Sequence, residues 1–135
     1  YLSGGAYLGG TAAANKLEDY EEGTFSATAT GTGTLNVVNE KYTKIGNVVT
    51  VYFQVDFSGA SGNLTISGLP FTSTPFTKSV GIGREDATSG YAVYGRLSSN
   101  STSIAMYYTG ATNNATPFQV ATGNFGFSIT YFTNL

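Results

Sequence analysis

Carboxylates are the side chains of this sequence best suited to acid–base catalysis, because histidine and cysteine are absent. Triads with a histidine base and cysteine nucleophiles are therefore excluded, as are zinc sites that contain either residue. A glycosidase needs two acids about 5–10 Å apart. Outside residues 18–22 the acids are Glu40, Asp56, Glu85 and Asp86. Glu85 and Asp86 are adjacent beside Arg84, a run typical of a solvated turn. We therefore expect no enzymatic activity, and polysaccharide cleavage stays only as a third alternative.

The acidic run Glu18-Asp19-Tyr20-Glu21-Glu22 holds four of the eight carboxylates of the chain. Hard cations such as Ca²⁺ take several carboxylate oxygens, so the run suggests a cation site. It lacks, however, the Asp-x-Asp-x-Asp-Gly spacing of a preformed calcium loop. A solvated charge run is the favoured interpretation, and in an assembly its acids would pair with Lys16, Lys41 or Lys44. We predict no metal and no cofactor.

Charge is sparse in this chain, since 10% of its residues are charged, its net charge is −2 and its six Lys and Arg residues are scattered. Nucleic-acid binding needs basic side chains clustered on one face, so we predict no nucleic-acid partner. No segment approaches the ~20 consecutive apolar residues of a membrane-spanning helix, so we predict no membrane insertion. The solvent-facing surface must then be polar through Ser, Thr and Asn.

Side-chain alternation predicts antiparallel strands from residue 23 onward. One face of residues 49–57 carries Val49, Val51, Phe53, Val55 and Phe57, and the other carries Thr50, Gln54 and Asp56. Ile45-Gly46-Asn47-Val48 gives a tight turn, so residues 41–45 and 49–57 form a hairpin. Further strands are predicted at 63–67, 76–83, 91–98, 103–109, 118–122 and 125–133, and the connectors include 58–62, 84–90, 98–101 and 110–115.

Short strands with turn residues about every ten positions predict an all-β fold. We expect an antiparallel, jelly-roll-like β-sandwich head at residues 23–135 on a short glycine-rich N-terminal stem at residues 1–22. Within this region, residues 11–20 have the composition of a short helix. The chain begins with Tyr1 rather than Met, so we expect it to be the end of a longer polypeptide.

Aromatic side chains are expected on both faces of several strands. Alternation points Tyr94 away from the face that carries Tyr91, and Tyr107 away from the face that carries Tyr108. Phe132 likewise lies across from the apolar face of its strand. Two interpretations stay open. Either these rings lie on the surface of the sheet, or they form a subunit interface, because a monomer rarely exposes a large apolar patch.

Ligand binding is the activity that the residue types favour. A saccharide site needs an aromatic platform and flat arrays of amide, hydroxyl and guanidinium groups on rigid strands. Loops at one end of a stiff scaffold often carry recognition, and the connectors of this chain supply such groups next to strand tyrosines. The candidate ligand-binding residues are Arg84, Asp86, Tyr91, Tyr94, Arg96, Asn100, Tyr107, Asn113 and Asn114.

Four sequence motifs occur in order along the first half of the chain. They are YLGG at residues 7–10, LEDYEEGTF at 17–25, YTKIGN at 42–47 and SGLPF at 67–71. Together and in this order they resemble the C-terminal domains of phage tail-fibre and related virion structural proteins. Residues 72–135 contain no such motif and resemble that group only in their general character.

The resemblance implies a homotrimeric appendage on the virion surface. Its head would attach to a host surface glycan, and several weak sites acting together would raise the avidity. Its upstream part would join other virion proteins. The alternative is a purely structural domain, which builds or decorates the particle and recognises only its own copies.

Overall fold

The computed structural model describes residues 6–7, 16–17, 20–75, 78–109, 115–117 and 122–134. Its strands are β1 (Ala6–Tyr7), β2 (Lys16–Leu17), β3 (Tyr20–Gly23), β4 (Thr28–Ile45), β5 (Val48–Ser67), β6 (Ser79–Glu85), β7 (Ala92–Leu97), β8 (Ser103–Thr109), β9 (Ala115–Pro117) and β10 (Thr122–Phe132). The pairings between them are antiparallel, so the all-β, antiparallel part of the prediction is confirmed. No helix within these described ranges is long and apolar enough to cross a membrane.

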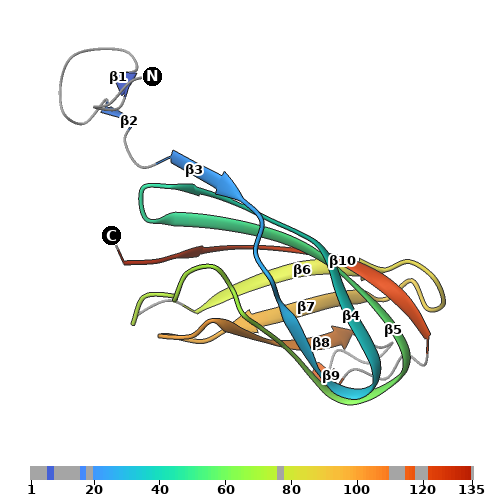
Figure 1. Ribbon diagram of the computed structural model, residues 1–135. Coiled ribbons are helices and arrows are strands. Elements are labelled where there is room, and N and C mark those ends of the chain that lie inside the picture. Colours follow the sequence, from blue (N-terminus) through green and yellow to red (C-terminus); the bar gives the residue numbers. More distant parts are fainter. Residues whose placement is uncertain are drawn as a thin grey trace.

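In the described part of the chain, eight strands form one sheet in the order β3-β4-β5-β10-β6-β7-β8-β9 (Figure 1). Strand β5 has a further partner, because its first half pairs with β10 and its end, Leu64–Ser67, pairs with β8. Strands β5, β10, β6, β7 and β8 therefore close into a five-stranded barrel. Strands β3 and β4 continue the sheet beyond β5, and β9 continues it beyond β8. Strands β1 and β2 pair with each other in a separate two-stranded sheet.

The predicted jelly-roll sandwich is not confirmed, because β5 does not end where the sequence predicts a connector. Strand β5 runs without a break through residues 58–62. Gly59 and Gly62 have φ values of 64° and 78° there, a left-handed region that favours glycine. The register between β4 and β5 shifts in the same region, and Figure 1 shows the two strands curving together. The bend brings the end of β5 to β8, so one sheet closes on itself instead of stacking on a second sheet.

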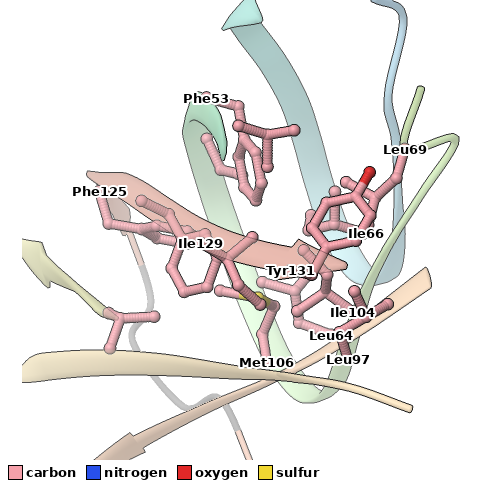
Figure 2. Close-up of a cluster of buried hydrophobic side chains, with 14 of the residues drawn as sticks. Phe53, Leu64, Ile66, Leu69, Leu97, Ile104, Met106, Phe125, Ile129 and Tyr131 are labelled. Atoms are coloured by element: carbon pink, nitrogen blue, oxygen red, sulfur yellow. The ribbon is translucent and has the colours of Figure 1, made fainter. Parts of the chain in front are cut away.

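The barrel interior is filled by the apolar faces that alternation predicts, mainly those of β5 and β10 (Figure 2). The buried side chains of these two strands include Val49, Val51, Phe53, Val55, Phe57, Phe125, Phe127, Ile129 and Tyr131. The ring centroids of Phe53 and Phe127 lie 5.1 Å apart, which is a favourable aromatic contact. Phe132 is exposed on the opposite face, as predicted.

Glycines on β6 and β7 leave room for the rings inside the barrel. A Cβ atom on Gly95 would lie 2.5 Å from Ile104 Cγ2 and 2.6 Å from Phe127 Cζ. A Cβ atom on Gly81 would also overlap the ring of Phe127. Barrels with few strands have narrow interiors, which alternating large and small side chains must fill. The ring of Phe127 therefore occupies space that these two glycines leave open.

Gly95→Ala should destabilise the barrel, because the added methyl group would overlap two side chains in a packed interior. Overpacking of this kind costs roughly 1–3 kcal/mol, so the midpoint of denaturant unfolding should fall. Gly126→Ala on β10 is the matched control, since the nearest atom is the Tyr52 hydroxyl oxygen at 3.2 Å, at the far end of a side chain that can rotate. Equal midpoints for the two variants would contradict this account of the interior.

Residues from three of the sequence motifs meet near β3, at one edge of the large sheet. The Lys44 ammonium group lies 3.7 Å from the Glu21 carboxylate and 5.6 Å from the ring centre of Phe71. Phe71 in turn packs edge-on against Tyr42, with 5.4 Å between ring centroids. Only 7% of Lys44 is exposed, so its charge is largely shielded from water. One acid of the acidic run is thus paired with a lysine, and no three His, Cys, Asp or Glu residues in the described ranges are grouped to hold a metal ion.

The short helix considered for residues 11–20 is not present at the positions that the structure describes. Lys16 and Leu17 lie in β2, paired with β1, and Tyr20 begins β3, paired with β4. A segment of this length is a marginal helix on its own, and at Lys16, Leu17 and Tyr20 strand pairing overrides its helical propensity. The large sheet begins at Tyr20, slightly before the predicted head at residues 23–135. The division into stem and head itself stays a prediction.

The region between β8 and β10 also differs from expectation where it is described. Strand β9 pairs with the end of β8, although its first residue lies in the predicted connector 110–115. Of the predicted strand at 118–122, Thr122 opens β10 and the other positions lie outside the described residues. Strand β6 begins and ends later than predicted, so it includes Arg84 and Glu85.

Candidate ligand-binding surface

The outer face of the barrel carries side chains in rows that run across the strands. Directly paired residues share one face of a sheet. From β5 through β10, β6 and β7 to β8, the pairing places in one row Tyr52, Ser128, Ile82, Tyr94 and Tyr107. Ile82 is 70% exposed and Tyr52 is 43% exposed. The row therefore presents apolar and aromatic surface on a rigid sheet.

A hollow of about 290 Å³ opens on this outer face. It is lined by Tyr52, Ile82, Arg84, Asp86, Gly126, Phe127 and Ser128. Gly126 lies on β10, the strand between β5 and β6, and it has no side chain to fill the space between them. The hydroxyl of Tyr52 reaches toward this position, where a Cβ atom would lie 3.2 Å away. The hollow thus has a glycine at its centre and an aromatic ring at its side.

A charged pair stands at the same hollow. Arg84 Nε lies 3.9 Å from Asp86 Oδ1, and both side chains are largely exposed. An ion pair in this setting contributes little to stability, and its hydrogen-bonding groups remain accessible to a ligand. Two of the predicted ligand-binding residues are therefore brought together.

Glu85 organises the loop between β6 and β7. The sequence interpretation of residues 84–86 as a solvated turn is wrong for Glu85, which is fully buried with 0% of its surface exposed. Its carboxylate accepts hydrogen bonds from the Ser89 hydroxyl and from the backbone N–H groups of Ala87, Thr88, Ser89 and Gly90. Successive amide groups directed at one anion form a concave binding site for it. One side chain therefore fixes the whole loop.

These hydrogen bonds determine the protonation state of Glu85. Burial raises the pKa of a carboxyl group, but the donors of Ser89, Ala87 and Thr88 together outweigh it and lower the pKa of Glu85 to about 2. The folded pKa is thus below the ordinary value of 4.5. Ionised Glu85 therefore stabilises the folded state above that ordinary value, and the stabilisation is lost as the pH falls toward 2.

Glu85→Gln should destabilise the protein at neutral pH and remove this acid dependence. The amide keeps the shape but loses the charge and turns an NH₂ group toward backbone donors, which costs roughly 1.5–3 kcal/mol. Melting temperatures measured from about pH 7 to about pH 2 should show the variant and the wild type converging at the acid end. Asp86→Asn is the matched control, because Asp86 is exposed. A constant difference over the whole range would refute this role of the carboxylate.

The four tyrosines of β7, β8 and their flanks form two separate stacks rather than one platform. Tyr94 and Tyr107 stack on the outer face with 5.2 Å between centroids and 19° between ring planes. Tyr91 stacks on Tyr108 at 5.6 Å and 16°. Tyr108 is paired with Val93, whose side chain is buried, so the second stack lies on the inner side of the sheet. The predicted opposition of the two faces is confirmed.

The other predicted residues are dispersed. Arg96 is exposed on β7, beyond the row of Tyr94. Asn100, with a φ of 52°, lies in the turn from β7 to β8, at the opposite end of β7 from the loop 84–90. The connectors 84–90 and 98–101 lie at opposite ends of β7, because successive connections of an antiparallel sheet alternate between its two ends. Asn113 and Asn114 lie outside the described residues.

Sequence reasoning missed five residues that line the hollow, namely Tyr52, Ile82, Gly126, Phe127 and Ser128. A signal for Tyr52 was present, since alternation already directs its neighbours Thr50 and Gln54 outward. No local signal shows that β10 lies between β5 and β6. The lining of the hollow could therefore not be predicted from the sequence, because it depends on the order of the strands.

No protein-family model matches this chain, and no curated protein matches it. Among solved structures, this chain is similar to the crystal structure of Dettilon tailspike protein (gp208), with a TM-score of 0.63 and 20% sequence identity. The similarity covers 85% of this chain and 24% of the tailspike chain. The chain thus shares its fold with a part, about a quarter, of a phage tailspike.

Proposed function

We propose that this chain is the C-terminal head of a phage tail-fibre or tailspike-like appendage, and that it adheres to saccharide on the host cell surface. The observation that carries the proposal is the hollow framed by Tyr52 and the Arg84–Asp86 pair, on a barrel that shares the fold of a tailspike part. The order of the sequence motifs supports the same class of protein. Such a head is located on the surface of the virion.

The residue types at the hollow suit a sugar. The ring of Tyr52 offers an apolar face to the C–H groups of a pyranose. The Arg84 guanidinium group donates hydrogen bonds in a planar fork, and the Asp86 carboxylate accepts them from hydroxyl groups. These groups stand on paired strands or on the loop that Glu85 holds, so binding orders little of the protein. A preformed concavity with few polar groups is the usual form of a small-molecule site.

The proposal assigns binding without catalysis. Glycoside cleavage needs a carboxylic acid with a raised pKa beside a second carboxylate. Glu85, the acid nearest in sequence to Asp86, has a lowered pKa and is occupied by the donors of its own loop. Asp86 lines the hollow, whereas Glu85 is turned into the protein. This arrangement favours recognition over cleavage.

Assembly with sister copies would give the head its avidity. Ile45 and Phe132 are exposed apolar side chains on either side of Val48, with which both are paired. Contact with another copy would remove such a cluster from water. In a homotrimer, three weak sites on one tip would bind together more strongly than any site alone. The upstream part of the polypeptide would connect the trimer to other virion proteins.

A purely structural role is the second candidate, and the same exposed apolar side chains favour it. In that case the domain recognises only its own copies, and its task is to build or decorate the particle. The hollow at Tyr52 would then have no saccharide ligand. The two candidates differ in a property that binding experiments measure directly.

A glycan array should detect binding of the whole chain to at least one bacterial surface saccharide. Tyr52→Ala should weaken that binding at least tenfold, about 1.4 kcal/mol, because the ring forms one side of the hollow. Tyr20→Ala removes another exposed tyrosine, on β3, and should bind like the wild type. Regular filaments without any saccharide binding would instead support the structural candidate.

Light scattering should give a solution mass about three times the 14.1 kDa of one chain. Phe132→Lys places a charge in the exposed apolar cluster and should shift the population toward single chains. A species of 14.1 kDa at every concentration of the unaltered protein would rule out the homotrimer.

A further inference from the structure

A second and larger hollow, of about 460 Å³, lies on the same outer face. Its lining residues are Thr34, Asn36, Asp56, Phe57, Ser58, Ala87, Thr122, Gly123 and Asn124. They come from β4, β5, β10 and the loop after β6. None of them belongs to the ligand-binding set that the sequence predicts.

Strand register arranges the polar side chains of this second hollow in two rows. Asn36, Asp56 and Asn124 pair directly across β4, β5 and β10. The next row, two residues further along each strand, consists of Thr34, Ser58 and Thr122. Neighbouring strands lie about 4.8 Å apart, so each row spans about 10 Å. The result is two short rows of amide, carboxylate and hydroxyl groups along a hollow whose lining surface, which includes Phe57 and Ala87, is mostly apolar.

The polar groups of the first row are largely unused by the protein itself. Within the ranges that the structure describes, the side-chain amides of Asn36 and Asn124 make no hydrogen bond. The Asp56 carboxylate accepts one there, from Gln54 Nε2 at 3.0 Å. Gln54 is held in turn by the Asn39 amide at 3.3 Å. Asp56 is therefore oriented by Gln54, and the row as a whole keeps most of its hydrogen-bonding capacity.

The loop between β6 and β7 forms a fixed wall of this hollow. The Asp86 N–H group donates to the Asn124 carbonyl at 3.0 Å. The Thr88 hydroxyl donates to the Thr122 carbonyl at 2.6 Å. These two bonds hold Ala87 beside the two rows. Because this loop is already hydrogen-bonded to β10, little of the site has to become ordered when a ligand binds.

The two hollows are consecutive along β10. Asn124 lines the second and Gly126 lines the first, and alternation places both on the outer face. Asp86 adjoins both, since its side chain lines the first hollow and its backbone is bonded to Asn124. A chain molecule lying on this face would therefore meet both hollows.

We propose that the second hollow is a subsite for a neutral, hydroxyl-rich sugar residue, so that the two hollows together hold an oligosaccharide. The inference rests on the proposed saccharide adhesion. It adds the path of the glycan over the protein surface and a preference for neutral over anionic sugars. Asp56 would accept hydrogen bonds from adjacent hydroxyl groups, while the amides of Asn36 and Asn124 bond on either side.

The charge at these rows selects against anionic sugars. A sugar carboxylate or phosphate placed over the first row would face the like charge of Asp56 at close range. The residues that line the hollow include no lysine or arginine to offset that repulsion. A neutral sugar meets no such penalty and satisfies the same groups.

NMR titration of the whole chain tests the subsite, with neutral glucose, galactose, mannose and rhamnose trisaccharides and with uronic-acid trisaccharides as ligands. Neutral ligands should shift the side-chain amide signals of Asn36 and Asn124. Asn36→Ala and Asn124→Ala should each weaken binding by about threefold to tenfold. Asp56→Asn should reduce the preference for neutral over anionic ligands. Asn63→Ala, at an exposed position further along β5, is the matched control and should change nothing.

The possible failures are distinguishable. If neutral ligands shift only signals of the first hollow, and Asn36→Ala binds like the wild type, the subsite is refuted while saccharide adhesion stands. If anionic and neutral ligands bind equally and Asp56→Asn has no effect, the assignment to neutral sugars is refuted. If none of these saccharides binds the intact chain, and the array is also blank, the subsite and the adhesion proposal fall together.

Discussion

Strand β5 is paired twice, with β10 along its first half and with β8 near its end, and this double pairing closes the barrel. Closure requires the bend at Gly59 and Gly62, where the backbone takes a left-handed conformation. It also leaves a narrow interior, in which Gly81 and Gly95 have no side chain beside the ring of Phe127. Each strand of the closed barrel is paired on both sides. Its outward side chains are therefore held in a fixed register with those of its neighbours.

The proposed binding surface takes its order from this closure. Polar and aromatic groups over β4, β5, β10 and β6 stand on paired strands, so their spacing is set by the backbone ladder. The one loop that contributes is held by the buried carboxylate of Glu85. Hydrogen bonds from backbone N–H groups of the loop replace the water that would otherwise solvate this carboxylate. Because 10% of its residues are charged, the chain has few side chains that could form ion pairs with a partner. Recognition would instead depend on amides, hydroxyls and a tyrosine ring in a preformed arrangement.

Residues from three of the sequence motifs that resemble phage fibre proteins pack against one another in this structure. Lys44, Glu21 and Phe71 come from three separate motifs and contact one another where the sheet begins. The two hollows, by contrast, are lined by residues outside the motifs, such as Tyr52 and Asp56. The packing contacts of the scaffold and the proposed recognition surface therefore involve different residues. A scaffold of this kind allows the ligand to change without a change of fold.

The sequence by itself determined the all-β, antiparallel class, the inward and outward faces of β5 and β10, and the tight turn at Gly46. These features follow from side-chain alternation and local backbone preference, which neighbouring residues define. It also placed Asp86 in the connector that follows β6, whereas Arg84 lies in β6. Only the tertiary structure decided that the sheet closes as a barrel, that Glu85 is buried, and that β4, β5 and β10 align their polar side chains. Each of these depends on contacts between residues far apart in the chain or on the path of a loop, and no local pattern encodes cross-strand register.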